Sequence, residues 1–163
     1  MLVYIIGMPL SGKSTLGKAL AEELNFDFFD TDAEIEKKAL MFIDEIFKNF
    51  GENKFRELET EILMELNKKK NTVIATGGGI ITNNTNNPYL KTGFVIYLKS
   101  EIKLLEERNK SSIKVRPLLN NYSLKELYEA RKDKYLALAD LVIDNSASVC
   151  EIVKTILSSL GEE

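Results

Sequence analysis

Hydrophobic residues in this chain gather in short continuous runs, and segments with helical periodicity separate these runs. Continuous rather than alternating hydrophobicity is typical of strands that are covered on both faces. The predicted strands are Leu2–Ile6, Phe28–Phe29 leading into Asp30, Val73–Ala75, Phe94–Leu98 and Leu141–Ile143. Alternation of strands and helices indicates a parallel sheet with right-handed crossovers, which is a doubly wound α/β domain.

Two segments are longer than a simple crossover. Residues 33–70 predict a helical insertion broken at Asn49–Asn53, and about 33–62 of it could line a cleft as a subdomain. Within it, aromatic and Met side chains are expected in the core rather than in a site: Phe42, Phe47, Phe55 and Met64.

Polar segments later in the chain predict loops. Residues 109–121 are rich in Lys and Ser and include Pro117, which indicates an exposed connection between two helices. This connection is either a mobile lid or a plain surface loop. The Asn-rich segment Thr82–Asn87 is also predicted to be a loop.

A phosphate-binding motif follows the first predicted strand. Residues 7–15, Gly-Met-Pro-Leu-Ser-Gly-Lys-Ser-Thr, match G-x-x-x-x-G-K-[ST] in the order strand, loop, helix. Backbone N–H groups of such a loop surround an anion, and the helix N-terminus adds its positive dipole end. We expect Lys13 to reach the β- and γ-phosphates of a nucleoside triphosphate and Ser14 to ligate Mg²⁺.

Two carboxylates stand where the second strand meets a helix. Asp30 could approach Mg²⁺ while Asp32 faces an acceptor hydroxyl. A purely structural interpretation is also open, because Thr31-Asp32-Ala33-Glu34 matches a capping box. The two interpretations are compatible.

The third predicted strand ends in Thr76-Gly77-Gly78-Gly79 and not in an acidic residue. The lack of a carboxylate there strengthens the assignment of Asp30 to the metal. Successive glycines allow close backbone approach, so their N–H groups could receive an anionic or polyhydroxy substrate, although a bare turn would look the same.

Arginine is used sparingly. The chain has 18 Lys and only four Arg, at positions 56, 108, 116 and 131. A guanidinium grips a carboxylate or phosphate with two parallel hydrogen bonds, which an ammonium cannot do. These four residues are therefore candidates for anion recognition, with a surface role as the alternative.

Composition narrows the class of protein. With 163 residues and 44% hydrophobic content, the chain is expected to form one domain, 1–163. A net charge of −3 argues against a broad nucleic-acid surface, and the first apolar run is too short to span a bilayer. There is no His, so an acid–base step falls to a carboxylate, Lys, Tyr or water. The lone Cys150, expected in a helix, fits a reduced cytoplasmic protein.

Taken together, these motifs resemble the shikimate kinase family, over about residues 1–160. They occur in the family's order: the phosphate loop, Asp30-x-Asp32, Gly51-Glu52-x-x-Phe55-Arg56-x-x-Glu59, Gly77-Gly78-Gly79, Arg116-Pro117-Leu118-Leu119 and Arg131-x-x-x-Tyr135.

The resemblance implies a P-loop three-layer α/β/α fold with a five-stranded parallel sheet, a helical substrate-binding subdomain and a closing lid at about 109–121. It also implies transfer of the ATP γ-phosphoryl group, with one Mg²⁺ per ATP, to the 3-hydroxyl of shikimate on the way to chorismate and aromatic amino acids. A monomer is the default expectation.

The resemblance also implies roles for individual residues. Lys13, Asp32 and Arg116 are the expected catalytic residues, with Asp32 orienting the hydroxyl and Arg116 neutralising the transferring phosphate. ATP is expected to contact Gly7, Pro9, Leu10, Ser11, Gly12, Lys13, Ser14, Thr15, Arg108 and Arg116, with Arg108 packing on adenine. Shikimate is expected to contact Asp32, Arg56, Gly77, Gly78, Gly79 and Arg131, and Mg²⁺ to contact Ser14 and Asp30.

This chain departs from the family pattern in two places. The family commonly has Gly at the position of Leu10, so altered nucleotide affinity is expected. The loop 144–147 lacks a proline that often occurs there, which leaves base specificity open.

Two alternatives differ from this interpretation. A kinase of another hydroxy acid such as gluconate would also need carboxylate-binding arginines, but residues 51–56 and 77–79 favour shikimate. A catalytically silent nucleotide-binding protein need not keep Lys13, Asp32 and Arg116.

Overall fold

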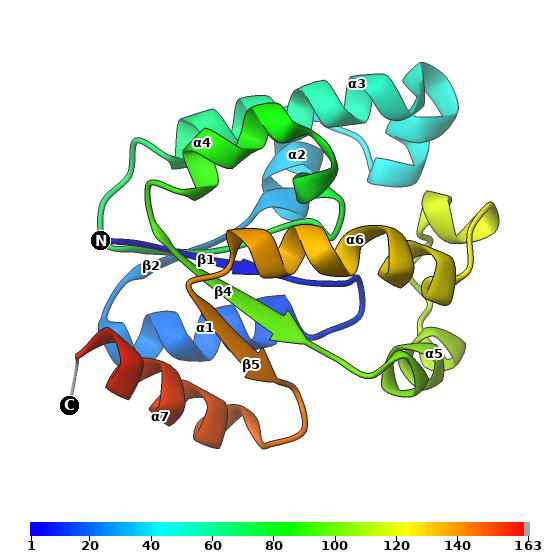
Figure 1. Ribbon diagram of the computed structural model, residues 1–163. Coiled ribbons are helices and arrows are strands. Elements are labelled where there is room, and N and C mark those ends of the chain that lie inside the picture. Colours follow the sequence, from blue (N-terminus) through cyan, green and yellow to red (C-terminus); the bar gives the residue numbers. More distant parts are fainter. Residues whose placement is uncertain (162–163) are drawn as a thin grey trace.

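The computed structural model describes residues 1–161, and its centre is a five-stranded parallel sheet in the order β2-β3-β1-β4-β5 (Figure 1). The strands are β1 Leu2–Ile6, β2 Asp27–Asp30, β3 Thr72–Ala75, β4 Phe94–Lys99 and β5 Leu141–Asp144. All five predicted strands are confirmed to within one residue at their ends. The expected domain 1–163 ends in residues 162–163, which lie outside the described residues.

Helices cover both faces of the sheet. The helices are α1 Lys13–Leu24, α2 Thr31–Ala39, α3 Ile43–Leu66, α4 Asn87–Leu90, α5 Ile102–Ser111, α6 Leu124–Leu138 and α7 Val149–Leu160, and the 3₁₀ turns are η1 Ile80–Thr82, η2 Asn84–Asn86 and η3 Pro117–Asn120. Helices α1 and α7 lie on one face, and α3 and α6 lie on the other (Figure 1). The predicted three-layer α/β/α architecture is confirmed.

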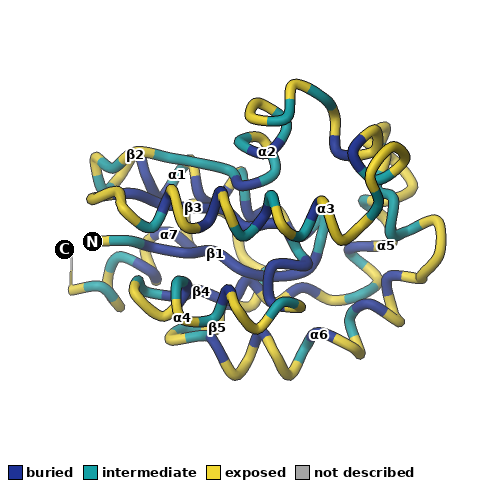
Figure 2. The backbone as a smooth tube through the Cα atoms, turned by 90° about the horizontal axis from the view of Figure 1, so that it is seen from above, coloured by how far each residue is buried: buried dark blue, intermediate teal, exposed yellow. Residues whose placement is uncertain are grey.

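Successive residues of each central strand enter two different cores, because side chains alternate between the faces of a sheet. In β1, Val3 and Ile5 pack with α1 and α7, whereas Tyr4 and Ile6 pack with α3 and α6. The expected burial on both faces holds for β1, β3 and β4 (Figure 2). It is wrong for β2 and β5, which are edge strands and only partly covered.

The strand register brings three loops together. Ile5 of β1 and Asp30 of β2 both pair with Ala75 of β3. The chain leaves these parallel strands at the same edge, where ligands of α/β proteins bind. The phosphate loop, the Asp30–Asp32 junction and the three glycines therefore adjoin, as the sequence predicts.

The insertion after β2 consists of α2 and α3. The predicted break at Asn49–Asn53 is confirmed at Gly51, whose backbone (φ 83°, ψ 174°) is non-helical inside α3. A second break at Leu40, where φ is 53°, separates the two helices and was not predicted.

The expectation that four insertion side chains lie in the core is only partly correct. Phe55 is buried, and Phe47 packs partly against the core. The expectation is wrong for Phe42, which is 66% exposed directly before α3, and for Met64, which is 41% exposed.

The predicted polar loops contain short helical turns. Thr82–Asn87 is not a plain loop, because η2 and the start of α4 occupy it; the Asn83 side chain accepts from Thr85 N at 3.1 Å and caps η2. Helix α5 extends to Ser111 and η3 begins at Pro117, so residues 112–116 are the irregular part of the expected lid. Among residues 1–161, no helix combines the length and the apolarity that crossing a membrane requires.

Candidate active site

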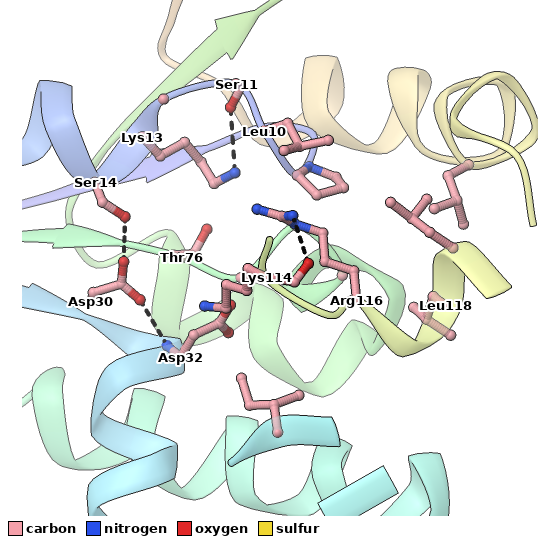
Figure 3. Close-up of a pocket in the computed structure, with 18 of the residues that line it drawn as sticks. Leu10, Ser11, Lys13, Ser14, Asp30, Asp32, Thr76, Lys114, Arg116 and Leu118 are labelled. Atoms are coloured by element: carbon pink, nitrogen blue, oxygen red, sulfur yellow. Dashed lines mark hydrogen bonds between the residues drawn. The ribbon is translucent and has the colours of Figure 1, made fainter. Parts of the chain in front are cut away.

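A cavity of about 800 Å³ opens at the carboxyl ends of the strands (Figure 3). Its walls come from the phosphate loop, the Asp30–Asp32 junction, the three glycines, α3, α6 and residues 114–119. Every residue expected to contact ATP, shikimate or Mg²⁺ lines this cavity except Gly7. Gly7 lies behind the loop, where a Cβ would come within 2.7 Å of Leu98 O.

The phosphate loop turns through backbone conformations that favour glycine. Gly12 (φ 91°) directly precedes α1, and Leu10 takes the left-handed region with φ 70°. This conformation costs a residue with a side chain about 1 kcal/mol, which gives a physical reason for glycine at the position of Leu10. Arg108 Nη1 donates to Leu10 O at 2.8 Å, so α5 holds this corner of the loop.

Lys13 is buried and points into the loop. Its ammonium donates to Met8 O at 2.7 Å and to Ser11 Oγ at 3.3 Å. Burial lowers its pKa to about 8, although the charges of Asp32 and Asp30 oppose that shift. The loop thus holds a desolvated cation close to two carboxylates, and an anion would stabilise its charge.

Asp30 serves two elements at once. The Ser14 hydroxyl donates to one of its carboxylate oxygens, and the other accepts from Asp32 N at 2.9 Å and caps α2 (Figure 3). The capping box expected to begin at Thr31 is therefore wrong, because the cap comes one residue earlier. Thr31 instead accepts from Gly77 N at 2.9 Å and ties α2 to the three glycines.

Asp32 and Glu59 each direct a carboxylate oxygen toward the same place. A Cβ on Gly77 would lie 2.7 Å from Asp32 Oδ1 and 2.9 Å from Glu59 Oε1. Both oxygens are buried, and neither has a hydrogen-bond partner within residues 1–161. A buried acceptor without a partner is costly, so these oxygens are suited to ligand hydroxyl groups.

Burial also raises the pKa of both carboxyl groups. For Asp32 the neighbouring Asp30 adds to the shift, and Lys114 and Lys13 oppose it. Burial raises the pKa of Glu59 to about 7 against the charge of Arg56.

Two guanidinium groups face the cavity near the glycines. Arg56 on α3 donates to Glu59 Oε2 at 2.8 Å and to Glu52 Oε1 at 3.2 Å, which fixes the plane of its fork. A Cβ on Gly79 would come within 2.4 Å of this fork. Arg131 on α6 is only 5% exposed and lines the same cavity.

Residues 112–116 bring two more cations to the cavity. Arg116 Nη1 donates to Ser112 Oγ at 2.8 Å and to Lys114 O at 3.3 Å, and partial burial lowers the Arg116 pKa. Lys114 extends toward Asp32 (Figure 3).

Sequence reasoning assigned no role to three residues that the structure places here. Lys114 carries no distinctive signal among 18 lysines. Glu59 is part of the motif that contains Arg56, and its role could have been inferred because a residue three positions after Arg56 on a helix shares its face. Asn145, in the loop after β5, donates to Ser11 O at 2.6 Å and to Ser100 Oγ at 3.1 Å, and thus anchors the phosphate loop.

Comparison with known proteins agrees with this geometry. The family model for shikimate kinase matches residues 9–161. Shikimate kinase from Rippkaea orientalis is 42% identical over 97% of this chain and 87% of the relative, and that from Aquifex aeolicus is 39% identical over 98% and 96%. A solved structure of shikimate kinase from Acinetobacter baumannii in complex with shikimate has a TM-score of 0.88 and 35% identity, over 98% of this chain and 92% of that one. The chain belongs to the shikimate kinase family.

Proposed function

We propose that this protein transfers the γ-phosphoryl group of ATP to the 3-hydroxyl of shikimate, giving shikimate 3-phosphate and ADP. The observation that carries the proposal is the buried oxygen of Asp32 that has no hydrogen-bond partner among residues 1–161, in the cavity that the phosphate loop, Arg56 and Arg131 line. A hydroxyl bound there would face the phosphates, and a carboxylate on the same molecule would reach the two arginines.

ATP would bind with its phosphates in the N–H groups of the phosphate loop and at the Lys13 ammonium. Ser14 and Asp30 present adjoining hard oxygen atoms, which suit Mg²⁺. Within residues 1–161, no three carboxylates gather into a metal site of their own, so the ion would depend on the ATP phosphates as further ligands. When bound, Mg²⁺ would neutralise charge on the phosphate oxygens.

Shikimate would bind through its carboxylate and its ring hydroxyl groups. Arg56 and Arg131 supply donors for the carboxylate, and the Arg56 fork is already oriented by Glu59. The N–H groups of Gly78 and Gly79 lie along the same wall and would contact the ring substituents.

In the transfer step, a lone pair of the substrate oxygen forms a bond to the γ-phosphorus while the bond between that phosphorus and the ADP oxygen breaks. Asp32 orients the hydroxyl and accepts its proton late in the step. Lys13 and Arg116 would stabilise the charge on the transferring oxygens, and closure of residues 112–116 would exclude water.

The experiment that tests this function measures ADP release from MgATP by the purified protein with shikimate, with gluconate and without an acceptor, and identifies the product. Shikimate-dependent release with shikimate 3-phosphate as product is expected. Release with gluconate alone would keep the kinase and reject the substrate. ATP binding without turnover would favour the silent nucleotide-binding protein.

A further inference from the structure

A buried tyrosine on α6 forms a hydrogen bond to the peptide group between Gly78 and Gly79. The Tyr135 hydroxyl on α6 donates to Gly78 O, and among residues 1–161 this is the hydrogen bond that the structure gives this carbonyl. Tyr135 is fully buried, and its ring stacks on Tyr97 of β4 with centroids 4.9 Å apart. Burial raises the pKa of the phenol well above its usual value, although the neighbouring Arg131 opposes that shift, so the hydroxyl keeps its proton and stays a donor.

Fixing this carbonyl also fixes an N–H group. The carbonyl of Gly78 and the N–H of Gly79 belong to one planar trans peptide, so they point in opposite directions. With glycine on both sides, little steric resistance opposes rotation of that plane. The hydroxyl of Tyr135 therefore restrains an orientation that the glycines themselves leave free.

The restrained N–H group belongs to the substrate wall. Gly79 lines the cavity and lies against the Arg56 guanidinium. Among residues 1–161, the structure gives no hydrogen-bond acceptor to the N–H of Gly78 or of Gly79, whereas Gly77 N is bound to Thr31. Gly79, whose N–H has no acceptor among residues 1–161, thus borders the Arg56 fork, and Gly78 lies against Pro9.

We propose that Tyr135 is a positioning residue for the substrate, and that its hydroxyl holds the Gly78–Gly79 peptide so that the Gly79 N–H faces the ligand held by Arg56. The proposal rests on the proposed function for the identity of that ligand. Tyr135 itself does not line the cavity.

The variant Tyr135→Phe removes only the hydroxyl and keeps the stacked ring. Tyr97→Phe is the matched control, because it removes a hydroxyl from the other ring of the pair, to which the structure gives no hydrogen bond within residues 1–161. We expect Tyr135→Phe to raise the KM for shikimate about tenfold with a much smaller change in kcat and in the KM for ATP, because orientation of a binding group is lost. Tyr97→Phe should leave all three constants within about twofold of the wild type.

Amide hydrogen exchange supplies a readout that does not need activity. Exchange in peptides that span residues 76–82 should accelerate in Tyr135→Phe and stay unchanged in Tyr97→Phe. Unchanged exchange together with an unchanged KM for shikimate would overturn the proposal, even if the melting temperature fell. A wild type that fails to phosphorylate shikimate would instead refute the proposed function, and the exchange result would still decide the role of Tyr135.

Discussion

Arg131 is a buried residue that lines the cavity. A buried guanidinium presents two parallel N–H groups to a carboxylate, and a lysine in its place presents one point charge on a shorter reach. We predict that Arg131→Lys raises the KM for shikimate at least tenfold and the KM for ATP less than threefold, by loss of the second hydrogen bond. Steady-state kinetics with each substrate varied in turn checks this, and a near-normal KM for shikimate would refute the role of Arg131 as a carboxylate clamp.

Glu59 makes stability depend on pH. Its pKa of about 7 in the folded protein exceeds the ordinary 4.5, so the folded state binds more protons than the unfolded state between these values. The stabilising contribution is complete below pH 4.5 and is lost as the pH rises to about 7. By the size of the shift this loss is at most about 3 kcal/mol.

The neutral variant Glu59→Gln lacks this titration. We predict that its melting temperature, relative to the wild type, improves steadily from pH 5 to pH 8. Glu52→Gln is the control for loss of a charge beside Arg56, because Glu52 also contacts Arg56 but its side chain is half-exposed. A Glu59→Gln difference that is equal at pH 5 and pH 8 would contradict the prediction.

Among single residues, the sequence predicts those that belong to a motif with fixed spacing. Lys13 and Ser14 stand at fixed positions in an eight-residue motif, and both line the cavity. Lys114 could not be predicted, because its place depends on the path of an irregular segment. Its role and those of the predicted site residues remain predictions until kinetics test them.

Helix α3 owes its bend to a single residue. Gly51 has φ 83° and ψ 174°, a region that only glycine occupies readily, and a Cβ there would meet nothing within 4 Å. The cost of Gly51→Ala is therefore conformational rather than steric. We predict a loss of about 1–3 kcal/mol in the free energy of unfolding, together with a raised KM for shikimate, since Arg56 lies just after the bend.

Gly161 offers the matched control for this prediction. It also has positive φ, 76°, with nothing within 4 Å of a Cβ, but it follows the C-terminal end of α7, whereas the α7 residues that line the cavity, Val149 and Ile152, stand in the first half of that helix. Gly161→Ala should cost about 1 kcal/mol and leave the KM unchanged. Urea unfolding measures the loss of stability in both variants, and steady-state kinetics measure their KM for shikimate. Equal KM values in the two variants would show that the bend does not position Arg56.

Elements could be predicted where hydrophobicity is continuous. The five strands follow from apolar runs, whereas helix starts depend on which nearby side chain reaches the free N–H groups. On α2 the cap is Asp30 rather than Thr31, because the Asp30 carboxylate accepts from Asp32 N while the Thr31 hydroxyl accepts from Gly77 N. The short turns after Thr82 were missed because Asn side chains both cap turns and mark loops.

The whole molecule presents one exposed segment beside its cavity. Ile113 and Val115 are 100% and 57% exposed and flank Lys114, a trypsin site. We predict that MgATP together with shikimate slows tryptic cleavage after Lys114 at least fivefold, because closure of residues 112–116 removes this bond from solvent. Mass spectrometry of the fragments checks this.

The variant Lys13→Met tests whether protection from trypsin requires phosphate binding at Lys13. Lys13→Met should fold normally, lose turnover and lose protection by ATP at equal concentration, while trypsin still cuts it at the same bond. Protection of the wild type that persists unchanged in Lys13→Met would refute closure driven by phosphate binding. The order of the strands in the sheet and the shape of the cavity could not be predicted from residue spacing alone. Both depend on hydrogen-bond pairing between strands that are far apart in the sequence.

Gly78 joins two walls of the cavity. A Cβ at this position would come within 2.8 Å of Pro9 in the phosphate loop, so the backbone of the three glycines packs directly against that loop. If a ligand displaces one of these two walls, the contact transmits the displacement to the other wall. Thermodynamic reciprocity then requires that the factor by which shikimate changes the affinity for ATP equals the factor by which ATP changes the affinity for shikimate. Under the proposed function, this backbone contact is a route by which either substrate would change the affinity for the other.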